Sequence, residues 1–330
     1  MLFRFVPRPL AAGAVLLTLG ALTGCPATKN GKILDTPTSG NIRVVVDETL
    51  RPIIAAHLDS FQSLYPAAKV RPTYAPEGEA LAAFMASDSV RDLFATRRLT
   101  ADEEAELNKQ QIFPVQTRIA IDGVAVILHP SNPDSLLSVA QVAQLCGGQV
   151  AQWSQLNADN PLGAATVVFD HSASSTRTYV RDSVLHGQPV AATAFATRTN
   201  DALIEYVATH PGAIGLIGVN WISDHDDAAV RGFLKRVRVA ALTTKRGGAT
   251  TADFVKPYQA NIALWKLRRP PYYPLCRELY VISREGRAGL GTGFASFVAG
   301  EKGQLIFLKS GLVPATVPVR LVQTADDRPQ

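Results

Sequence analysis

The chain has 330 residues, of which 47% are hydrophobic and 18% are charged, with 24 glycines and 21 prolines. This composition is that of an ordinary globular protein, which excludes collagen, a coiled coil and extensive disorder, and the length is sufficient for two domains. The formal net charge is +5, runs of Lys or Arg never exceed two residues, and there are 3 cysteines. These features argue against nucleic-acid binding, a disulfide framework and a four-cysteine zinc site.

Residues 1–24 have the pattern of a secretory signal peptide, because Arg4 and Arg8 precede an apolar stretch that ends in small residues. The apolar stretch, residues 10–22, is shorter than the roughly 20 residues that a membrane-spanning helix needs. It is followed by Leu22-Thr23-Gly24-Cys25, which resembles a bacterial lipobox. A plain signal peptide that happens to contain a cysteine is the alternative.

The lipobox resemblance implies that Cys25 becomes the N-terminus and carries lipid, including acyl chains such as palmitate. Residues 25–40 are small, polar and interrupted by Pro and Gly, so we expect a flexible tether there. The folded part would then lie outside the cytoplasm and contact the membrane through its lipid anchor alone.

From residue 42 onward, short β-branched runs alternate with amphipathic stretches, which is typical of an α/β protein. We expect Pro72 to place its strand at a sheet edge or in an irregular position, and the Thr100 segment to form a capping box. The strand and helix order predicts a largely parallel sheet covered on both faces. Strands are predicted at 42–46, 69–74 and 92–96, and helices at 50–65, 79–86 and from Thr100.

A long β-like run at 118–128 indicates that the chain crosses into a second lobe, and 274–279 indicates the return crossing. We therefore predict lobe I at 41–118 and 278–330, lobe II at 119–277, and two hinge crossings. Open α/β sheets bind ligands at the carboxyl ends of their strands, which predicts a cleft between the lobes. The remaining predicted elements are helices at 139–145, from Ser174, 201–208, 293–299 and 304–309, and strands at 166–169 and 213–219.

Four strand-to-helix turns carry polar residues suited to an anion: 47–49, 75–79, 95–98 and 170–177. The last is the clearest, because Ser and Thr hydroxyls and Arg177 stand where a helix begins, and a helix start presents unpaired N–H groups. The alternative is an ordinary N-cap in a polar loop. For the Arg97-Arg98 pair, the alternative is an ordinary pair of surface arginines without a ligand.

Taken in order, several short motifs resemble a phosphate-binding lipoprotein, the substrate-binding subunit of the high-affinity phosphate ABC transporter. This family has a two-lobe type 2 periplasmic-binding-protein fold of the α/β class. The motifs are Cys25, residues 47–49, 95–100, Trp153 after Gly147-Gly148, 169–182, 257–260, 273–277 and 303–314.

The resemblance implies ligand-binding roles at the matched turns. Thr49 corresponds to a hydroxyl that donates to phosphate, and Ser174, Ser175 and Thr176 match a Ser-Gly-Thr loop with Ser175 in the place of glycine. Glu48, Thr96 and Arg177 flank these positions, and Gly78 lies near the second loop of the family, whose serine is missing here.

Two departures concern charge. The third loop of the family has an acidic residue that accepts the proton of hydrogen phosphate, and Arg97 stands there; the arginine that precedes the Ser-Gly-Thr loop falls on or near Asp170. The charge roles are therefore predicted to be exchanged, with Arg97 and Arg177 supplying the guanidinium. A buried acceptor distinguishes phosphate, which carries a proton, from sulfate, which carries none. Candidates for that acceptor are Asp47, Glu48, Glu77 and Asp170.

From these residues and the resemblance we expect a monomeric solute-binding lipoprotein that captures inorganic phosphate and delivers it to an ABC permease. We expect no enzymatic activity, cofactor, metal or nucleic-acid partner. The alternatives are a sensory lipoprotein for another oxyanion, such as sulfate or molybdate, and an exported phosphatase-like enzyme. The enzyme would need a metal cluster or an activated nucleophile, and neither pattern occurs in the sequence. Pairing of Cys146 with Cys276 is left open.

Overall fold

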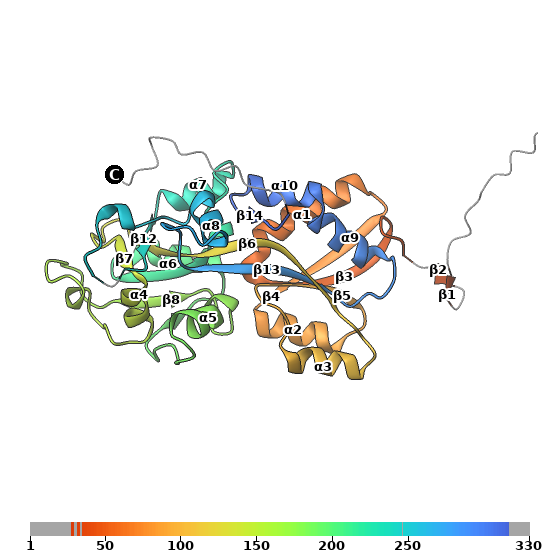
Figure 1. Cartoon of the computed structure of the whole chain (residues 1–330), viewed down its shortest axis with the longest axis horizontal. Helices are drawn as coiled ribbons and strands as arrows, with labels where there is room; N and C mark the ends of the chain where they lie inside the picture. Colours follow the sequence, from red (N-terminus) through yellow and green to blue (C-terminus); the bar gives the residue numbers. More distant parts are fainter. Residues whose placement is uncertain (1–27, 30–31, 34, 246, 317–330) are drawn as a thin grey trace, which may run out of the picture. The chain divides into compact units, whose positions relative to one another are not determined.

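The computed structural model describes residues 28–29, 32–33, 35–245 and 247–316, and the chain divides into the units Met1–Leu34 and Asp35–Gln330 (Figure 1). In the first unit, β1 (Thr28–Lys29) and β2 (Lys32–Ile33) pair antiparallel. The predicted signal peptide and Cys25 lie outside the described residues. Among the helices that are described, none combines the length and the apolarity needed to cross a membrane.

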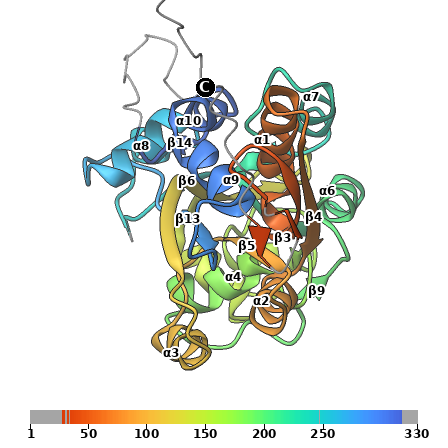
Figure 2. The same cartoon turned by 90° about the vertical axis from the view of Figure 1, so that its right-hand side faces the viewer.

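The second unit begins with a three-stranded parallel arrangement, which we call the first lobe together with its helices. In it, β3 (Gly40–Asp47) lies between β4 (Ala68–Ala75) and β5 (Val90–Ala95). Helices α1 (Arg51–Leu64) and α9 (Leu290–Ala299) cover one face, and α2 (Glu77–Ala86) and α3 (Ala101–Lys109) cover the other (Figure 2).

The two faces of this sheet explain the apolar run in β3. Successive side chains of a strand point to opposite faces, so Val44 and Val46 pack with Phe61 in one core, while Val45 packs with Phe84 in another. Because both faces are covered, β3 is apolar without alternation. β4 is the edge strand, as Pro72 predicted.

Two long strands join the first lobe to the second: β6 (Val115–Leu128) and β13 (Cys276–Ser283). They pair antiparallel with each other, and β6 then pairs antiparallel with β10 (Ala213–Gly218). With β8 (Thr166–Phe169) and β9 (Phe195–Ala196) at the far edge, the strand order is β4-β3-β5-β13-β6-β10-β8-β9. The prediction of a largely parallel sheet is confirmed for β4, β3 and β5, the strands from which it was made. The sheet as a whole is mixed, because the crossing strands β13 and β6 run antiparallel to their neighbours. The predicted lobe boundaries fall inside β6 and β13 and stay a prediction.

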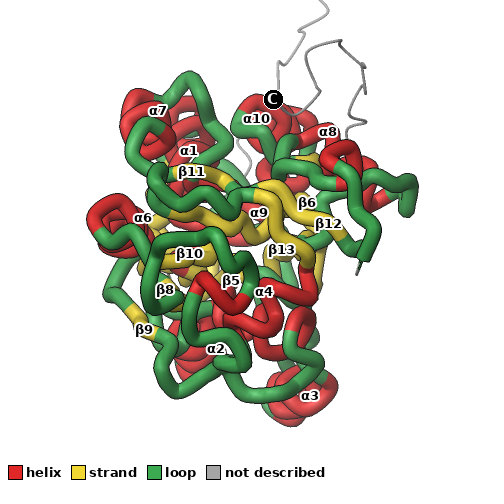
Figure 3. Tube along the Cα trace, turned by 90° about the vertical axis from the view of Figure 1, so that its left-hand side faces the viewer, coloured by secondary structure: helices red, strands yellow, loops and turns green. Residues whose placement is uncertain are grey.

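The second lobe is built around β8 (Thr166–Phe169) and β10, which lie side by side and parallel, with α6 (Asn200–Thr209) beside them (Figure 3). After β8 comes α5 (Ser175–Tyr179), which continues as a π-helical turn over Val180–Val184. The other elements of the unit are β7 (Leu136–Ser138), α4 (Val139–Cys146), β9 (Phe195–Ala196), α7 (Ala228–Leu234), β11 (Arg238–Val239), β12 (Ala241–Thr243), α8 (Gln259–Lys266), α10 (Glu301–Lys309), β14 (Val313–Pro314) and the 3₁₀ turns η1 (Glu48–Leu50), η2 (Trp153–Gln155), η4 (Val219–Trp221) and η5 (Thr251–Asp253).

The predicted flexible tether ends earlier than residue 40. Asp35 accepts hydrogen bonds from the Leu290 N–H at 2.7 Å and from Arg287, whose Nη1 also donates to the Asp35 carbonyl at 2.9 Å. These contacts fix the segment to the start of α9, so residues 35–40 belong to the folded unit and the prediction is wrong for them. Cys146 and Cys276 are both buried free thiols.

Candidate functional site

Two hydroxyls, one from each lobe, meet in the interior. Thr49 lies in η1 directly after β3, and Ser175 begins α5 after β8. Their side-chain oxygens are 3.1 Å apart, and both residues are buried. Each stands in the turn that follows the carboxyl end of a parallel strand, where an α/β sheet places its ligand-binding residues. The fold thus brings together two of the residues predicted to bind the ligand.

A buried guanidinium lies against both hydroxyls. Arg277 of β13 stands opposite Asp122 of β6 in the strand register, and its Nε and Nη2 donate to Asp122 Oδ2 at 3.2 and 3.0 Å. Its Nη1 lies 3.3 Å from Ser175 Oγ, and its Nη2 lies 3.5 Å from Thr49 Oγ1. The Arg277 side chain is only 2% exposed. The ion pair compensates the buried charge, and the remaining N–H groups face the hydroxyls, where an oxyanion could accept them.

The second lobe also holds the backbone of Thr49. Asn220 Nδ2 and Trp221 Nε1, both in η4 after β10, donate to the Thr49 carbonyl at 2.9 Å each. All three residues are buried. Hydrogen bonds therefore join the two lobes at the cluster. Residues of the second lobe position the backbone of Thr49, which belongs to the first lobe.

The three residues of the predicted Ser174–Thr176 loop have different contacts. Ser174 is the N-cap of α5, because its Oγ accepts from the Arg177 N–H at 3.2 Å. Ser175 points its hydroxyl at Thr49 and Arg277, whereas Thr176 has a buried hydroxyl without a hydrogen-bond partner. An unpaired buried hydroxyl is unfavourable unless a ligand or water satisfies it.

Two buried acids lie close to the cluster. Asp47 Oδ1 accepts from the Thr49 N–H at 3.0 Å and from Thr49 Oγ1 at 3.1 Å, while its Oδ2 is buried without a partner. Burial raises the pKa of Asp47 to about 7, against the opposing effect of the Arg277 charge. Asp170 follows β8, both of its carboxylate oxygens are buried without a hydrogen-bond partner, and burial raises its pKa as well. Directly before the serine loop, where the resembling family has an arginine, this chain therefore has an acid.

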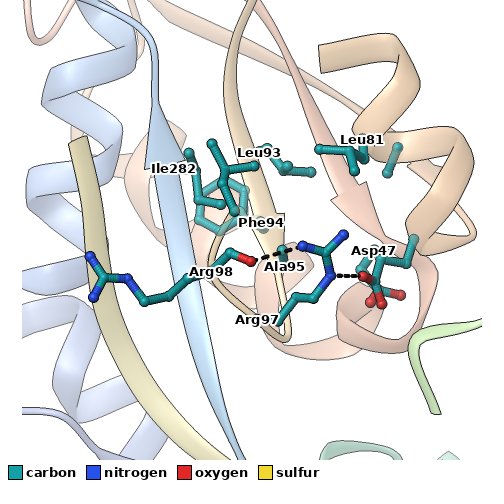
Figure 4. A pocket seen from close by; sticks show the side chains of 11 residues that line it. Asp47, Leu81, Leu93, Phe94, Ala95, Arg97, Arg98 and Ile282 are labelled. Atoms are coloured by element: carbon teal, nitrogen blue, oxygen red, sulfur yellow. Dashed lines mark hydrogen bonds and ion pairs between the residues drawn. The ribbon is translucent and has the colours of Figure 1, made fainter. Parts of the chain in front are cut away.

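The arginines of the third predicted turn, residues 95–98, form no hydrogen bond with Thr49, Ser175 or Arg277 in the part of the chain that the structure describes. Arg97 pairs with Glu77 and makes two bonds to Glu103, from Nη1 at 2.8 Å and from Nη2 at 2.9 Å. The hydrogen bonds that Arg97 donates to Glu103 raise the pKa of Arg97 above its ordinary value. Figure 4 shows that the guanidinium groups of Arg97 and Arg98 point in opposite directions. The guanidinium in the cluster comes from Arg277 instead.

The sequence reasoning missed Arg277 as a site residue, although it named the 273–277 motif. A usable signal exists: an arginine in one predicted crossing and the Asp122-Gly123 pair in the other. A cross-strand ion pair between two strands that span both lobes would have placed a charge at the cleft. That inference needs the strand register, which the sequence alone does not supply.

Other predicted residues lie at the margin. Glu48 pairs with Arg51 at 2.8 Å, Arg177 Nη1 donates to the Ser172 carbonyl at 3.0 Å, and Gly78 is exposed in the first turn of α2. Thr96 is buried and lines a hollow of about 510 Å³ beside the cluster, which Arg97, Ser175, Tyr179, Arg277 and Tyr280 also line. Within the described residues, no group of three or more His, Cys, Asp or Glu side chains is arranged to hold a metal ion.

The family model of the PBP superfamily domain matches residues 34–302, which is most of the chain. The protein belongs to the PBP superfamily. Among curated relatives, the phosphate-binding protein PstS of Pseudomonas aeruginosa is 23% identical over 303 residues, covering 87% of this chain and 86% of the relative. PstS of Staphylococcus aureus is 24% identical over 298 residues, covering 89% and 83%.

Solved structures support the fold. A putative phosphate ABC transporter substrate-binding protein from Clostridium perfringens, with bound phosphate, matches with a TM-score of 0.68 at 19% identity, covering 84% of this chain and 100% of that one. An ABC-type phosphate transport receptor from Vibrio cholerae matches with a TM-score of 0.60 at 19% identity, covering 83% and 99%. The two-lobe fold of a periplasmic binding protein is thereby confirmed.

Proposed function

We propose that this PBP-superfamily protein captures inorganic phosphate between its lobes outside the cytoplasm and delivers it to the permease of an ABC transporter. We further propose that it is a monomer tethered by lipid at Cys25 and that it has no enzymatic activity. The names of its relatives and structural neighbours, which bind or transport phosphate, support this function. The observation that carries it is the buried cluster of Thr49, Ser175 and Arg277.

The chemistry of the cluster suits a tetrahedral oxyanion. Thr49 and Ser175 are hydroxyl donors from opposite lobes, and Arg277 supplies a positive charge with N–H groups aimed at both. In this structure these groups contact one another, so we propose that phosphate enters from the adjacent hollow and replaces the hydroxyl-to-hydroxyl contact. Closure removes water from the site, which strengthens the charge interactions there.

Calorimetric titration of the purified protein with phosphate tests the proposal. Thr49→Val is expected to weaken phosphate binding by about 1–3 kcal/mol, because it removes a donor to a charged group while keeping the side-chain shape. Thr209→Val, at an exposed position in α6, is the matched control and should bind like the unmodified protein. Absence of binding heat up to roughly millimolar phosphate would refute the function. An unchanged affinity in Thr49→Val would remove this residue from the site.

A further inference from the structure

The hollow beside the cluster is larger than inorganic phosphate needs. Its volume is about 510 Å³, and Ser175 and Arg277 of the cluster lie in its wall. Sites that enclose organic ligands measure roughly 300–1,000 Å³, whereas inorganic phosphate takes up the space of only a few water molecules of about 30 Å³ each. The hollow is present although Thr49 and Ser175 already contact each other between the lobes, at 3.1 Å. A ligand held by the cluster therefore has room for a further group.

Two arginines in the wall of the hollow carry charges that no acid balances among the described residues. They are Arg98, in the turn after β5, and Arg268, just after α8, and both are exposed. The guanidinium of Arg98 lies 6.0 Å from the centre of the Tyr280 ring, and that of Arg268 lies 4.8 Å from the Trp265 ring. A guanidinium held over a ring by cation–π attraction keeps N–H donors available for an anion.

The acids of the hollow do not cancel these two charges. Each acid that lines the hollow is already paired with another arginine: Glu77 with Arg97, Asp182 with Arg181, and Glu278 with Arg118. Arg277 is likewise balanced by Asp122. Arg98 and Arg268 are thus the excess positive charge of the wall, and they favour an anionic group in the hollow in addition to the one at the cluster.

We propose that this site also binds phosphoryl compounds that carry a second anionic group, such as pyrophosphate or a phosphonate with a carboxylate. One phosphoryl group lies at the cluster of Thr49, Ser175 and Arg277, and the second anionic group lies in the hollow against Arg98 and Arg268. The inference rests on the proposed phosphate function and widens its class of ligands. Because the two arginines contact only the second group, they act on the larger ligands and leave the binding of phosphate itself unchanged.

Competition calorimetry in metal-free buffer tests the proposal with four probes: inorganic phosphate, methyl phosphate, phosphonoacetate and pyrophosphate. Methyl phosphate is the control ligand, since it adds size without a second charge. The proteins are the unmodified chain, the double variant Arg98→Gln with Arg268→Gln, and Arg269→Gln. Arg269 is the matched control, because it is exposed and adjacent to Arg268 but does not line the hollow. Thermal unfolding of each variant establishes that it is folded.

Pyrophosphate and phosphonoacetate are expected to displace phosphate from the unmodified protein and to bind more tightly than methyl phosphate. The double variant should bind both of them roughly 3- to 30-fold more weakly, because two exposed ion pairs are lost. Its affinity for phosphate and for methyl phosphate should change by less than about twofold. Arg269→Gln should bind all four probes like the unmodified protein.

Three results would overturn the inference while leaving the phosphate function in place. In the first, phosphate binds and neither of the two larger anions displaces it. In the second, pyrophosphate binds without competing with phosphate, which would locate it elsewhere on the protein. In the third, the double variant loses affinity equally for all four probes, which would mean that the arginines only add to the general field. A protein that binds none of the probes refutes the phosphate function itself.

Discussion

At the residue scale, buried acids govern how this protein responds to pH. Asp92 in β5 is 0% exposed, and burial raises its pKa from 3.8 to about 7, with the neighbouring Glu285 charge acting in the same direction. A carboxyl group whose pKa is higher in the folded state binds its proton more tightly there than in the unfolded chain. The stability that this group contributes is therefore present below its ordinary pKa and is lost as the pH rises through about 7.

Asp92→Asn is expected to separate this effect from others, because asparagine resembles the protonated acid. Near pH 4 the variant and the unmodified protein should have similar free energies of unfolding. Near pH 8 the variant should be more stable by up to about 4 kcal/mol, the equivalent of a shift of about three pKa units. Urea denaturation at a series of pH values measures the difference. A difference that does not change with pH would show that Asp92 does not titrate as described.

The residues of the site also show what the sequence could and could not predict. Thr49 and Ser175 were found because they occupy strand-to-helix turns, a local pattern that the sequence displays. Arg277 was missed as a ligand because its role depends on standing opposite Asp122 in another strand, more than a hundred residues away. Arg97 was predicted to supply the guanidinium of the site, but it forms ion pairs with Glu77 and Glu103. No sequence pattern indicates that these two acids share one arginine.

At the element scale, helix α3 illustrates a local signal that the fold follows. Thr100 Oγ1 accepts from the Glu103 N–H at 3.3 Å, and Glu103 accepts from the Thr100 N–H at 2.7 Å, so the predicted capping box is confirmed. The same Glu103 carboxylate also pairs with Arg97. One side chain thus begins the helix and secures the loop before it.

Thr100→Ala is expected to lower the free energy of unfolding by about 1 kcal/mol, because the helix loses its N-cap acceptor. Thr100→Ser, which keeps the hydroxyl, should remain close to the unmodified protein. Phosphate affinity should be unaffected in both, since α3 lies on the surface of the first lobe and contributes no residue to the cluster. Chemical denaturation and calorimetry measure the two quantities. A large loss of affinity in Thr100→Ala would mean that the loop carrying Arg97 depends on the cap.

Helix α9 shows where local signals fail. It was predicted at 293–299 but begins at Leu290, inside a glycine-rich stretch that disfavours helix. Packing overrides the propensity: a Cβ on Gly293 would lie 2.0 Å from the Pro37 carbonyl oxygen, and one on Gly289 would lie 2.1 Å from Glu285 Oε1. Gly293 allows the helix to pass against Pro37, at the start of the folded unit. That contact is tertiary, so no reading of the stretch alone predicts it.

At the scale of the whole folded unit, hydrogen bonds join the two lobes beside the cluster of Thr49, Ser175 and Arg277. Asn220 and Trp221 in the second lobe hold the Thr49 carbonyl of the first. These bonds favour the closed arrangement, and a ligand that binds only this arrangement has an apparent affinity proportional to its population.

Trp221→Phe removes one of the two donors and keeps an aromatic side chain. We expect weaker phosphate binding by roughly 3- to 30-fold, equivalent to a lost hydrogen bond of about 0.5–2 kcal/mol, with faster release. X-ray scattering without phosphate should give a larger radius of gyration for the variant than for the unmodified protein, and saturating phosphate should reduce the difference. Equal radii together with unchanged affinity would show that this bond does not stabilise closure.

The position of Arg277 has one more consequence. The crossing strand β13 belongs to neither lobe alone, so a rotation of the lobes would carry Thr49 and Ser175 through an arc while the guanidinium stays near the pivot. An incoming anion would therefore meet the same fixed charge at every opening angle and gain its hydroxyl partners only as the arc closes. On the proposed function, the charge that attracts the anion would come from β13 and the hydroxyls that retain it from the turns after β3 and β8.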